Sequence, residues 1–286
     1  MKLYTRIIIL AFFLFIAFGS CKVINPAEET PSYIHINKID LNTNYSTQGD
    51  SSNNISDAWV YIDDDAIGAF ELPATIPILN EGNHKIEIGP GIKLNGMAGY
   101  RSKYPFYESY INSNFKLVKD TIRAIYPSVQ YIASAKFAFK EDFENPGTIF
   151  EKTSLSDTSI VIEDRGNPTS NNKKCGAIHL VGTDTVFECS TINDYSLPTN
   201  NSPVMLEIDY KNDNNFEVGM IANFTTSQQY KESLVTILPS DEWNKIYINL
   251  TSFISANNAL SYKIYFYSHS SSAKNLYIDN IKLISF

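Results

Sequence analysis

The sequence has few of the residues that build metal and nucleophile sites. Its 286 residues include only three cysteines and four histidines. The histidines stand singly along the chain, and none is paired at a zinc-site spacing such as His-x-x-x-His; they are His35, His84, His179 and His269. There is no Gly-x-Ser-x-Gly motif and no glycine-rich phosphate loop. These absences argue against a zinc enzyme, a serine hydrolase of that type and a nucleotide-binding protein.

Positive charge is also scarce. The chain has 23 Lys and Arg against 31 Asp and Glu, a formal net charge of −8. Two of the basic residues, Lys2 and Arg6, precede the apolar run described next. A surface of this sign repels phosphate backbones, so we expect no nucleic-acid partner.

The sequence lacks an apolar run long enough for a permanent membrane span. The longest, Ile7 to Phe18, has twelve residues, which as a helix reach about 18 Å at roughly 1.5 Å per residue, short of a hydrocarbon core of roughly 30 Å. The run follows Lys2 and Arg6 and precedes small residues, as in a secretory signal peptide. We therefore predict that residues 1–20 are a cleaved signal peptide.

The end of this segment, Ala17-Phe18-Gly19-Ser20-Cys21, resembles the lipobox of bacterial lipoproteins, with Phe18 where leucine is usual. The resemblance implies that Cys21 becomes the acylated N-terminus and that residues 21–31 form a lipidated tether. Each buried acyl CH₂ contributes about 0.8 kcal/mol, so several chains make a stable membrane anchor. Lys22 rather than aspartate follows Cys21, which by resemblance to lipoprotein sorting implies the outer membrane of a bacterial envelope.

The rest of the chain alternates apolar and polar residues in short runs that end at Gly, Pro, Asn or Asp, which is the strand signal. Examples are Trp59–Ile62, His84–Ile88, Met205–Tyr210, Ile246–Leu250 and Lys263–Tyr267. We predict an all-β protein with two β-sandwich domains, residues 32–133 and 134–286. The lengths of the two segments suit one sandwich each.

The first segment carries a short pattern that resembles PEGA-type small β-sandwich modules. The matching residues are Val60-Tyr61-Ile62-Asp63, Gly68, Pro73, Leu79, Gly82-Asn83-His84 and Ile86. Modules of this type mostly serve as spacers or make protein contacts, so the resemblance implies such a role for residues 32–133.

Residues 137–286 are similar to the galactose-binding-like jelly rolls found among carbohydrate-binding modules. The similarity lies in Phe143-Glu144, in Asp241-Glu242-Trp243 before a strand, and in the closing strand Leu276–Leu283. It implies a C-terminal jelly roll. The fold serves glycan binding, protein contact and plain structure alike, and its sugar-binding residues lie in variable loops, so no individual site residue is implied.

Strict alternation in the closing strand would place Asp279 on one face with Ile281 and Leu283. A buried carboxylate needs a partner. The jelly-roll resemblance implies a structural calcium ion, with Glu144 and Asp279 as ligands. The alternative is that Asp279 accepts backbone N–H hydrogen bonds.

Two further candidate sites each have a structural alternative. Cys175 and Cys189 would face each other in a hairpin turning at Gly182, which predicts either a disulfide or two packed thiols. An aromatic cluster follows Gly99, and it predicts either a stacking surface for a sugar or partner protein, or ordinary strand packing. Its candidate stacking residues are Tyr104, Phe106 and Tyr107.

Three function classes are compatible with these features. We favour a non-catalytic envelope lipoprotein that binds a glycan or another surface ligand through the C-terminal jelly roll. The alternative is an envelope assembly or spacer protein that contacts other proteins. A hydrolase comes last, because the sequence shows no catalytic constellation. An exposed aromatic cleft rimmed by Asn, Asp or Gln would favour glycan binding.

The lipobox makes a direct prediction. Cys21→Ala should leave the chain uncleaved or soluble and unable to incorporate a labelled fatty acid, because the anchor chemistry needs the thiol. The measurement is fatty-acid labelling in a bacterial expression host, with the unchanged chain as control. A Cys21→Ala chain that still takes up label would contradict the lipoprotein interpretation.

Overall fold

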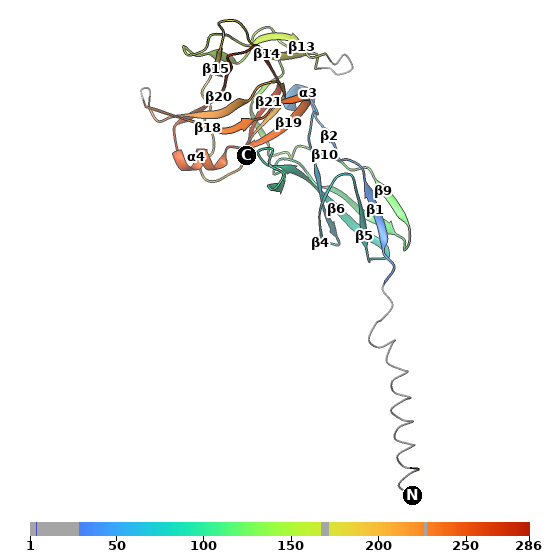
Figure 1. Ribbon diagram of the computed structural model, residues 1–286. Coiled ribbons are helices and arrows are strands. Elements are labelled where there is room, and N and C mark those ends of the chain that lie inside the picture. Colours follow the sequence, from blue (N-terminus) through green and yellow to red (C-terminus); the bar gives the residue numbers. More distant parts are fainter. Residues whose placement is uncertain (1–3, 5–28, 167–171, 226–227) are drawn as a thin grey trace.

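A computed structural model describes residue 4 and residues 29–166, 172–225 and 228–286 (Figure 1). Cys21 and nearly all of the predicted signal peptide and tether lie outside the described residues. The described chain is all-β, as predicted, with two short helices, α3 (Tyr45–Gln48) and α4 (Thr251–Asn257). In the described part of the chain, no helix has the length and apolar character to cross a bilayer.

Strands β1–β10 form the N-terminal part of the molecule. A three-stranded sheet has the order β5-β1-β9, a five-stranded sheet contains β4-β3-β6-β7 with β8 also on β6, and β2 pairs with β10. Alternate residues of the first two sheets point inward and share one hydrophobic core. The strands are β1 (Ser32–Ile36), β2 (Asp40–Asn42), β3 (Asp57–Ile62), β4 (Asp65–Glu71), β5 (Ala74–Ile78), β6 (Gly82–Lys93), β7 (Arg101–Lys103), β8 (Tyr110–Leu117), β9 (Ile122–Ile125) and β10 (Ser128–Gln130).

Strands β11–β21 form the C-terminal part, a sandwich of two antiparallel sheets around a second core. The six-stranded sheet has the order β13-β14-β21-β16-β19, with β11 also on β21, and the five-stranded sheet has the order β12-β15-β20-β17-β18. The strands are β11 (Lys136–Glu141), β12 (Phe150–Lys152), β13 (Val161–Asp164), β14 (Lys174–Leu180), β15 (Val186–Thr191), β16 (Val204–Asn212), β17 (Phe216–Asn223), β18 (Gln229–Ile237), β19 (Ser240–Asn249), β20 (Ser261–His269) and β21 (Lys274–Ser285).

The strand predictions are largely confirmed. Four of the five alternating segments lie within strands, namely β3, β6, β16 and β20, and the fifth, Ile246–Leu250, ends one residue beyond β19. The strand that opens the C-terminal part, however, ends at Glu141, before Phe143-Glu144, and Trp243 lies inside β19 rather than before it. The predicted boundary between residues 133 and 134 falls between β10 and β11, and its meaning as a boundary between independent domains stays a prediction.

The alternation predicted for the closing strand is wrong because β21 contains a bulge. Asn280 has a positive φ of 46°, and the pairing with β16 shifts register at this point. Ile278 faces the core before the bulge, and Ile281 and Leu283 face it after the bulge. Asp279 therefore lies on the opposite face from Ile281 and Leu283.

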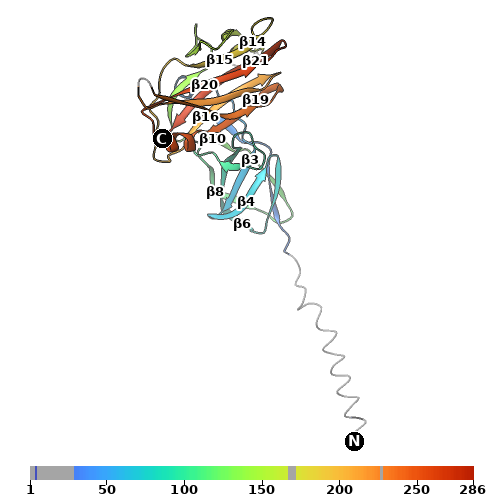
Figure 2. The ribbon, with the colours of Figure 1, turned by 60° about the vertical axis from the view of Figure 1, so that its left-hand side comes forward.

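The outer face of the six-stranded sheet, which points away from the sandwich core, packs against the N-terminal part (Figure 2). Met205, Tyr247 and Ile284 on this face belong to the hydrophobic core of the N-terminal part. The backbone N–H of Asn95 donates to the carbonyl oxygen of Tyr247 at 2.8 Å, and the N–H of Asn249 donates to Asn95 Oδ1 at 2.8 Å. The two parts thus share both a core and backbone hydrogen bonds at the edge of β19.

The close packing of the sandwich gives a stability prediction. A Cβ added at Gly219 on β17 would lie 2.3 Å from the carbonyl oxygen of Glu232 and 2.4 Å from the ring of Tyr265. Gly219→Ala should therefore lower the free energy of unfolding by about 1–3 kcal/mol, as overpacking does. Gly99→Ala, which meets nothing within 4 Å, is the control and should change it little. Urea unfolding of both variants is the measurement, and equal midpoints would contradict the packing described.

Candidate functional site

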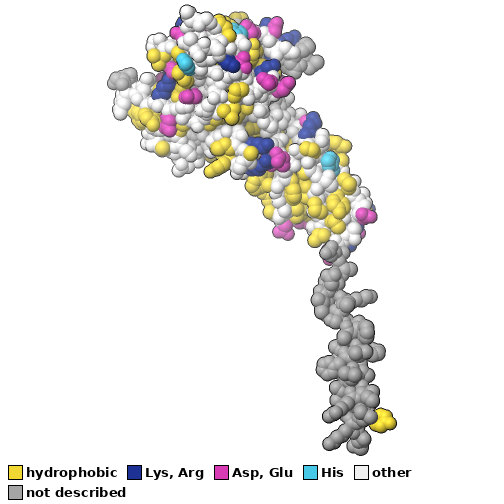
Figure 3. Space-filling model, in the orientation of Figure 1, with side chains coloured by type: hydrophobic (Ala, Val, Ile, Leu, Met, Phe, Trp, Pro, Cys, Tyr) yellow, Lys and Arg dark blue, Asp and Glu magenta, His cyan; other side chains and the backbone are white. Residues whose placement is uncertain are grey.

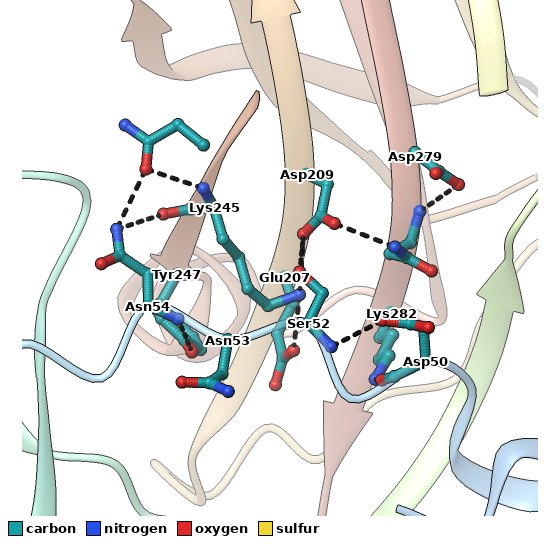
Figure 4. A network of polar contacts seen from close by, with 12 residues as sticks. Asp50, Ser52, Asn53, Asn54, Glu207, Asp209, Lys245, Tyr247, Asp279 and Lys282 are labelled. Atoms are coloured by element: carbon teal, nitrogen blue, oxygen red, sulfur yellow. Dashed lines mark hydrogen bonds and ion pairs between the residues drawn. The ribbon is translucent and has the colours of Figure 1, made fainter. Parts of the chain in front are cut away.

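A cluster of charged side chains is buried where the six-stranded sheet meets the N-terminal part (Figure 4). It contains Glu207 and Asp209 on β16, Lys245 on β19, and Asp279 and Lys282 on β21, each at most 5% exposed. These residues neighbour the core-facing positions of their strands and therefore lie on the outer face. The N-terminal part contacts Glu207, Asp209 and Lys282 there, whereas Asp279 contacts Arg165 and Asn172 of the C-terminal part.

Lys245 lies between two carboxylates. Its Nζ is 3.2 Å from Glu207 Oε2 and 3.2 Å from Asp209 Oδ1. Lys282 Nζ instead donates to the carbonyl oxygen of Asp50 at 2.6 Å and to the hydroxyl of Tyr131 at 3.2 Å. Buried ions need such partners because the protein interior solvates charge poorly.

Tyrosines of the N-terminal part complete the hydrogen bonding of this cluster. The hydroxyls of Tyr104 and Tyr131 donate to Glu207 Oε1 at 2.7 and 2.9 Å. The hydroxyls of Tyr107 and Tyr247 are 3.2 Å apart. Glu207 is thus solvated by side chains that come from the other part of the molecule.

Arg165, after β13, closes the open end of the cluster. Its Nη2 is 3.0 Å from Asp209 Oδ2 and its Nη1 pairs with Asp279. The guanidinium also lies over the ring of Trp243, 4.1 Å from the ring centre. Ser52 Oγ donates to Asp209 at 2.8 Å. Two carboxylates therefore hold one guanidinium in a fixed position against an aromatic ring.

The buried groups differ in their proton affinities. Burial raises the pKa of Asp279 well above its usual range. Burial also acts to raise the pKa of Asp209, but the charges of Lys245 and Arg165 outweigh it and lower that pKa. Burial lowers the pKa of Lys282 to about 8. The pKa values of these two neighbouring carboxyl groups are thus shifted in opposite directions, that of Asp209 downward and that of Asp279 upward.

A cavity of about 220 Å³ opens beside Arg165. It is lined by groups from both parts of the molecule, namely Ser52, Asn53, Asn54, Arg165, Asp209, Trp243, Asn244 and Lys245. A second cavity of about 230 Å³ shares Asn54, Asn244 and Lys245 with it and continues along the edge of β19 to Lys93 and Tyr210. We call the two together the seam cavity.

The seam cavity offers an aromatic ring beside several amide and hydroxyl groups. Trp243 is partly exposed, whereas Asn54 and Asn244 are exposed. Asn54 Nδ2 donates to Asn244 Oδ1 at 3.1 Å and to the carbonyl oxygen of Lys245 at 3.0 Å, which joins the two parts across the cavity. Such a site is suited to a ligand that has both hydroxyl groups and apolar C–H faces.

The structure does not combine Glu144 and Asp279 into a calcium site. Glu144 Oε1 accepts hydrogen bonds from the backbone N–H groups of Lys173 and Lys174. Asp279 is neutralised by Arg165 and also accepts the backbone N–H of Asn280 at 2.7 Å. Among the described residues there is no group of three or more His, Cys, Asp or Glu placed to hold a metal ion. The residues present do not fit calcium, because a guanidinium already supplies the positive charge.

The disulfide prediction is wrong, and both thiols are free and buried. β14 and β15 do not form a hairpin, because β14 belongs to the six-stranded sheet and β15 to the five-stranded sheet. Cys189 points into the sandwich core, whereas Cys175 is not part of that core. Burial raises the pKa of Cys175 to about 12, so this thiol stays protonated near neutral pH.

Of the two alternatives for the aromatic cluster, the stacking surface is contradicted and packing is found. Tyr104, Phe106 and Tyr107 are at most 5% exposed. Tyr104 and Tyr107 of the N-terminal part pack against Tyr247 of the C-terminal part. Phe106 packs against Phe286, with ring centres 4.8 Å apart. These rings are therefore packed and not available for stacking on a ligand. Their packing joins the two parts of the molecule, whereas the sequence suggested packing within a single strand.

Sequence reasoning missed the residues of the seam cavity. It had no reason to connect the Ser- and Asn-rich segment Ser51–Asn54 with a strand almost 200 positions later. The only local signal was the Asp241-Glu242-Trp243 motif, which pointed to a strand rather than to a site.

No protein-family profile and no curated protein sequence matches the chain. Solved carbohydrate-binding modules are similar to it in fold. The C-terminal family 22 module of Clostridium thermocellum Xyn10B has 12% identity and a TM-score of 0.38, covering 52% of this chain and 94% of that one. The CBM22-1 xylan-binding domain of Paenibacillus barcinonensis Xyn10C has 10% identity and a TM-score of 0.40, covering 54% and 97%.

A longer Clostridium thermocellum xylanase chain, with CBM22-1 and GH10 modules in complex with xylohexaose, has 11% identity and a TM-score of 0.41. The match covers 52% of this chain but only 28% of that one. These matches cover about half of this chain.

The buried amine of Lys282 gives a pH prediction. Its pKa is about 8 in the folded state against 10.5 ordinarily, so the unfolded chain binds this proton more tightly. The cost of charging the buried amine is fully present below pH 8 and is relieved as the pH rises toward 10.5. At about 1.36 kcal/mol per pKa unit the full relief is roughly 3 kcal/mol.

The measurement compares the unchanged chain with Lys282→Met by urea unfolding at several pH values from 7 to 10. The free energy of unfolding of the unchanged chain should rise relative to that of the variant across this range. The contribution of the tyrosines to the pH dependence cancels in this comparison, because both proteins contain them. A difference that is independent of pH would contradict the assignment.

Proposed function

We propose that this protein is a non-catalytic, lipid-anchored protein of the bacterial envelope that binds a glycan in the seam cavity. The observation that carries the glycan proposal is the position of Trp243, whose ring borders a cavity rimmed by Asn53, Asn54 and Asn244. The lipid anchor is supported by the lipobox-like segment that ends at Cys21.

The chemistry of the cavity matches that of a sugar. Sugar rings present C–H faces that pack on aromatic rings, and hydroxyl groups that exchange hydrogen bonds with amides and guanidinium groups. Trp243 supplies the ring, Asn54 and Asn244 supply amides, and Arg165 supplies N–H donors. The two cavities, of about 220 and 230 Å³, are each smaller than the roughly 300–1,000 Å³ typical of pockets for larger ligands, which suits a short stretch of sugar.

Two polar side chains that line the cavity, Arg165 and Asn54, are already fixed by contacts within the protein itself. Asp209 and Asp279 fix the guanidinium of Arg165, and Asn54 is fixed by two hydrogen bonds to β19. Ordering of such side chains would otherwise cost about 0.5–1.5 kcal/mol each on binding. A preorganised polar cavity of this kind supports ligand binding more than a spacer role.

The proposal is tested by titrating the full mature chain against a panel of plant and bacterial polysaccharides and their oligosaccharides, with calorimetry on any that bind. Trp243→Ala should weaken binding by about tenfold or more, since loss of one aromatic contact of about 1.4 kcal/mol has that effect. Tyr100→Ala is the matched control, because Tyr100 is 64% exposed and lies outside the cavity.

The control should bind as the unchanged chain does. Binding that Trp243→Ala leaves intact would exclude the seam cavity as the site. A panel in which nothing binds would overturn the glycan proposal and favour the envelope assembly or spacer role.

A further inference from the structure

The three-stranded sheet of the N-terminal part has one face in the core, and its outer face carries a row of apolar side chains beside the polar pair His35 and Thr75. Its inner face supplies core residues such as Ile34 and Ile76. On its outer face the strand register places Tyr33 of β1 between Pro77 of β5 and Ile122 of β9. A sheet with one face in water normally shows polar side chains there, so this row departs from the usual pattern.

The outer row is well exposed and has apolar neighbours. Ile122 is 64% exposed, Leu79 after β5 is 60% exposed, and Tyr126 after β9 is 81% exposed. Figure 3 shows hydrophobic side chains gathered over the N-terminal part, in the region where Figure 1 places β1 and β5. We call Tyr33, Pro77, Leu79, Ile122 and Tyr126 the outer patch. A continuous apolar patch of this kind marks an interaction surface, whereas single exposed apolar residues do not.

The position of the outer patch in the chain indicates what covers it. β1 begins at Ser32, eleven residues after Cys21. Eleven residues span at most about 40 Å when fully extended. If Cys21 carries the lipid, the patch is held close to the bilayer at all times.

The chemistry of the outer patch also fits a lipid headgroup region. Tyr33 and Tyr126 combine an apolar ring with a polar tip, the character of the aromatic residues found at membrane interfaces. The lysines beside the patch add no free positive charge, because Lys38 pairs with Asp40 at 2.7 Å and Lys119 pairs with Glu81 at 3.2 Å. Attraction to the bilayer would therefore come from the apolar and aromatic side chains.

We propose that the outer patch lies on the surface of the membrane that holds the lipid anchor. This inference rests on the anchor of the proposed function, and it is independent of the glycan. In Figure 1 the start of β1 is at the end of the N-terminal part farthest from the C-terminal part.

The test uses the mature chain with Cys21→Ser, which carries no acyl group, so that any membrane binding comes from the protein surface. Sedimentation with vesicles of phosphatidylethanolamine and phosphatidylglycerol, at millimolar lipid, measures the bound fraction. Ile122→Ser with Tyr126→Ser should lower the partition coefficient at least tenfold. Ile111→Ser with Tyr100→Ser is the matched control, since both residues are more than half exposed but lie outside the outer patch.

The control pair should partition as the parent chain does, and circular dichroism of all variants checks that they are folded. A parent chain that does not bind vesicles, or one that the two substitution pairs affect equally, would overturn the proposal. So would concentration-dependent dimerisation of the parent chain that Ile122→Ser with Tyr126→Ser abolishes, because a second copy would then cover the patch. Fatty-acid labelling of the natural Cys21 chain reports separately on the anchor.

Discussion

The arrangement of the molecule depends on the ion cluster between its two parts. Lys245 is buried between Glu207 and Asp209, and Glu207 also accepts hydrogen bonds from Tyr104 and Tyr131 of the N-terminal part. A buried ion without partners would cost several kcal/mol, so a displacement that separated these groups would be strongly unfavourable. The cluster therefore selects one relative position of the two parts more sharply than hydrophobic contact alone would.

The seam cavity is a consequence of the same constraint. Arg165 is held against Trp243 because Asp209 and Asp279 neutralise it, and Asp209 is in turn paired with Lys245. Ser52 and Asn54 reach the cavity from the N-terminal part only while the parts are docked. Binding in the cavity and docking of the two parts should consequently be linked, since a ligand that needs both sides favours the docked state.

Comparison of particular elements shows where sequence reasoning succeeded. The alternation in Met205–Tyr210 and Ile246–Leu250 correctly predicted β16 and β19, because a strand with one face in a core must repeat with a period of two. The same rule failed at Asp279, where the bulge at Asn280 inserts one residue and moves the following side chains to the opposite face. It also failed for Cys175 and Cys189, whose strands join different sheets.

The sequence by itself determined the all-β class and most of the strands, because these follow from neighbours along the chain. Only the tertiary structure decided that Tyr104 and Tyr107 are buried and that Asp279 pairs with Arg165 and not with a metal ion. It also decided that Asn54 and Trp243 line the same cavity. Alternation tells which residues share a face of a sheet. It does not tell what covers that face, since the covering residues come from segments whose distance in sequence leaves no local pattern.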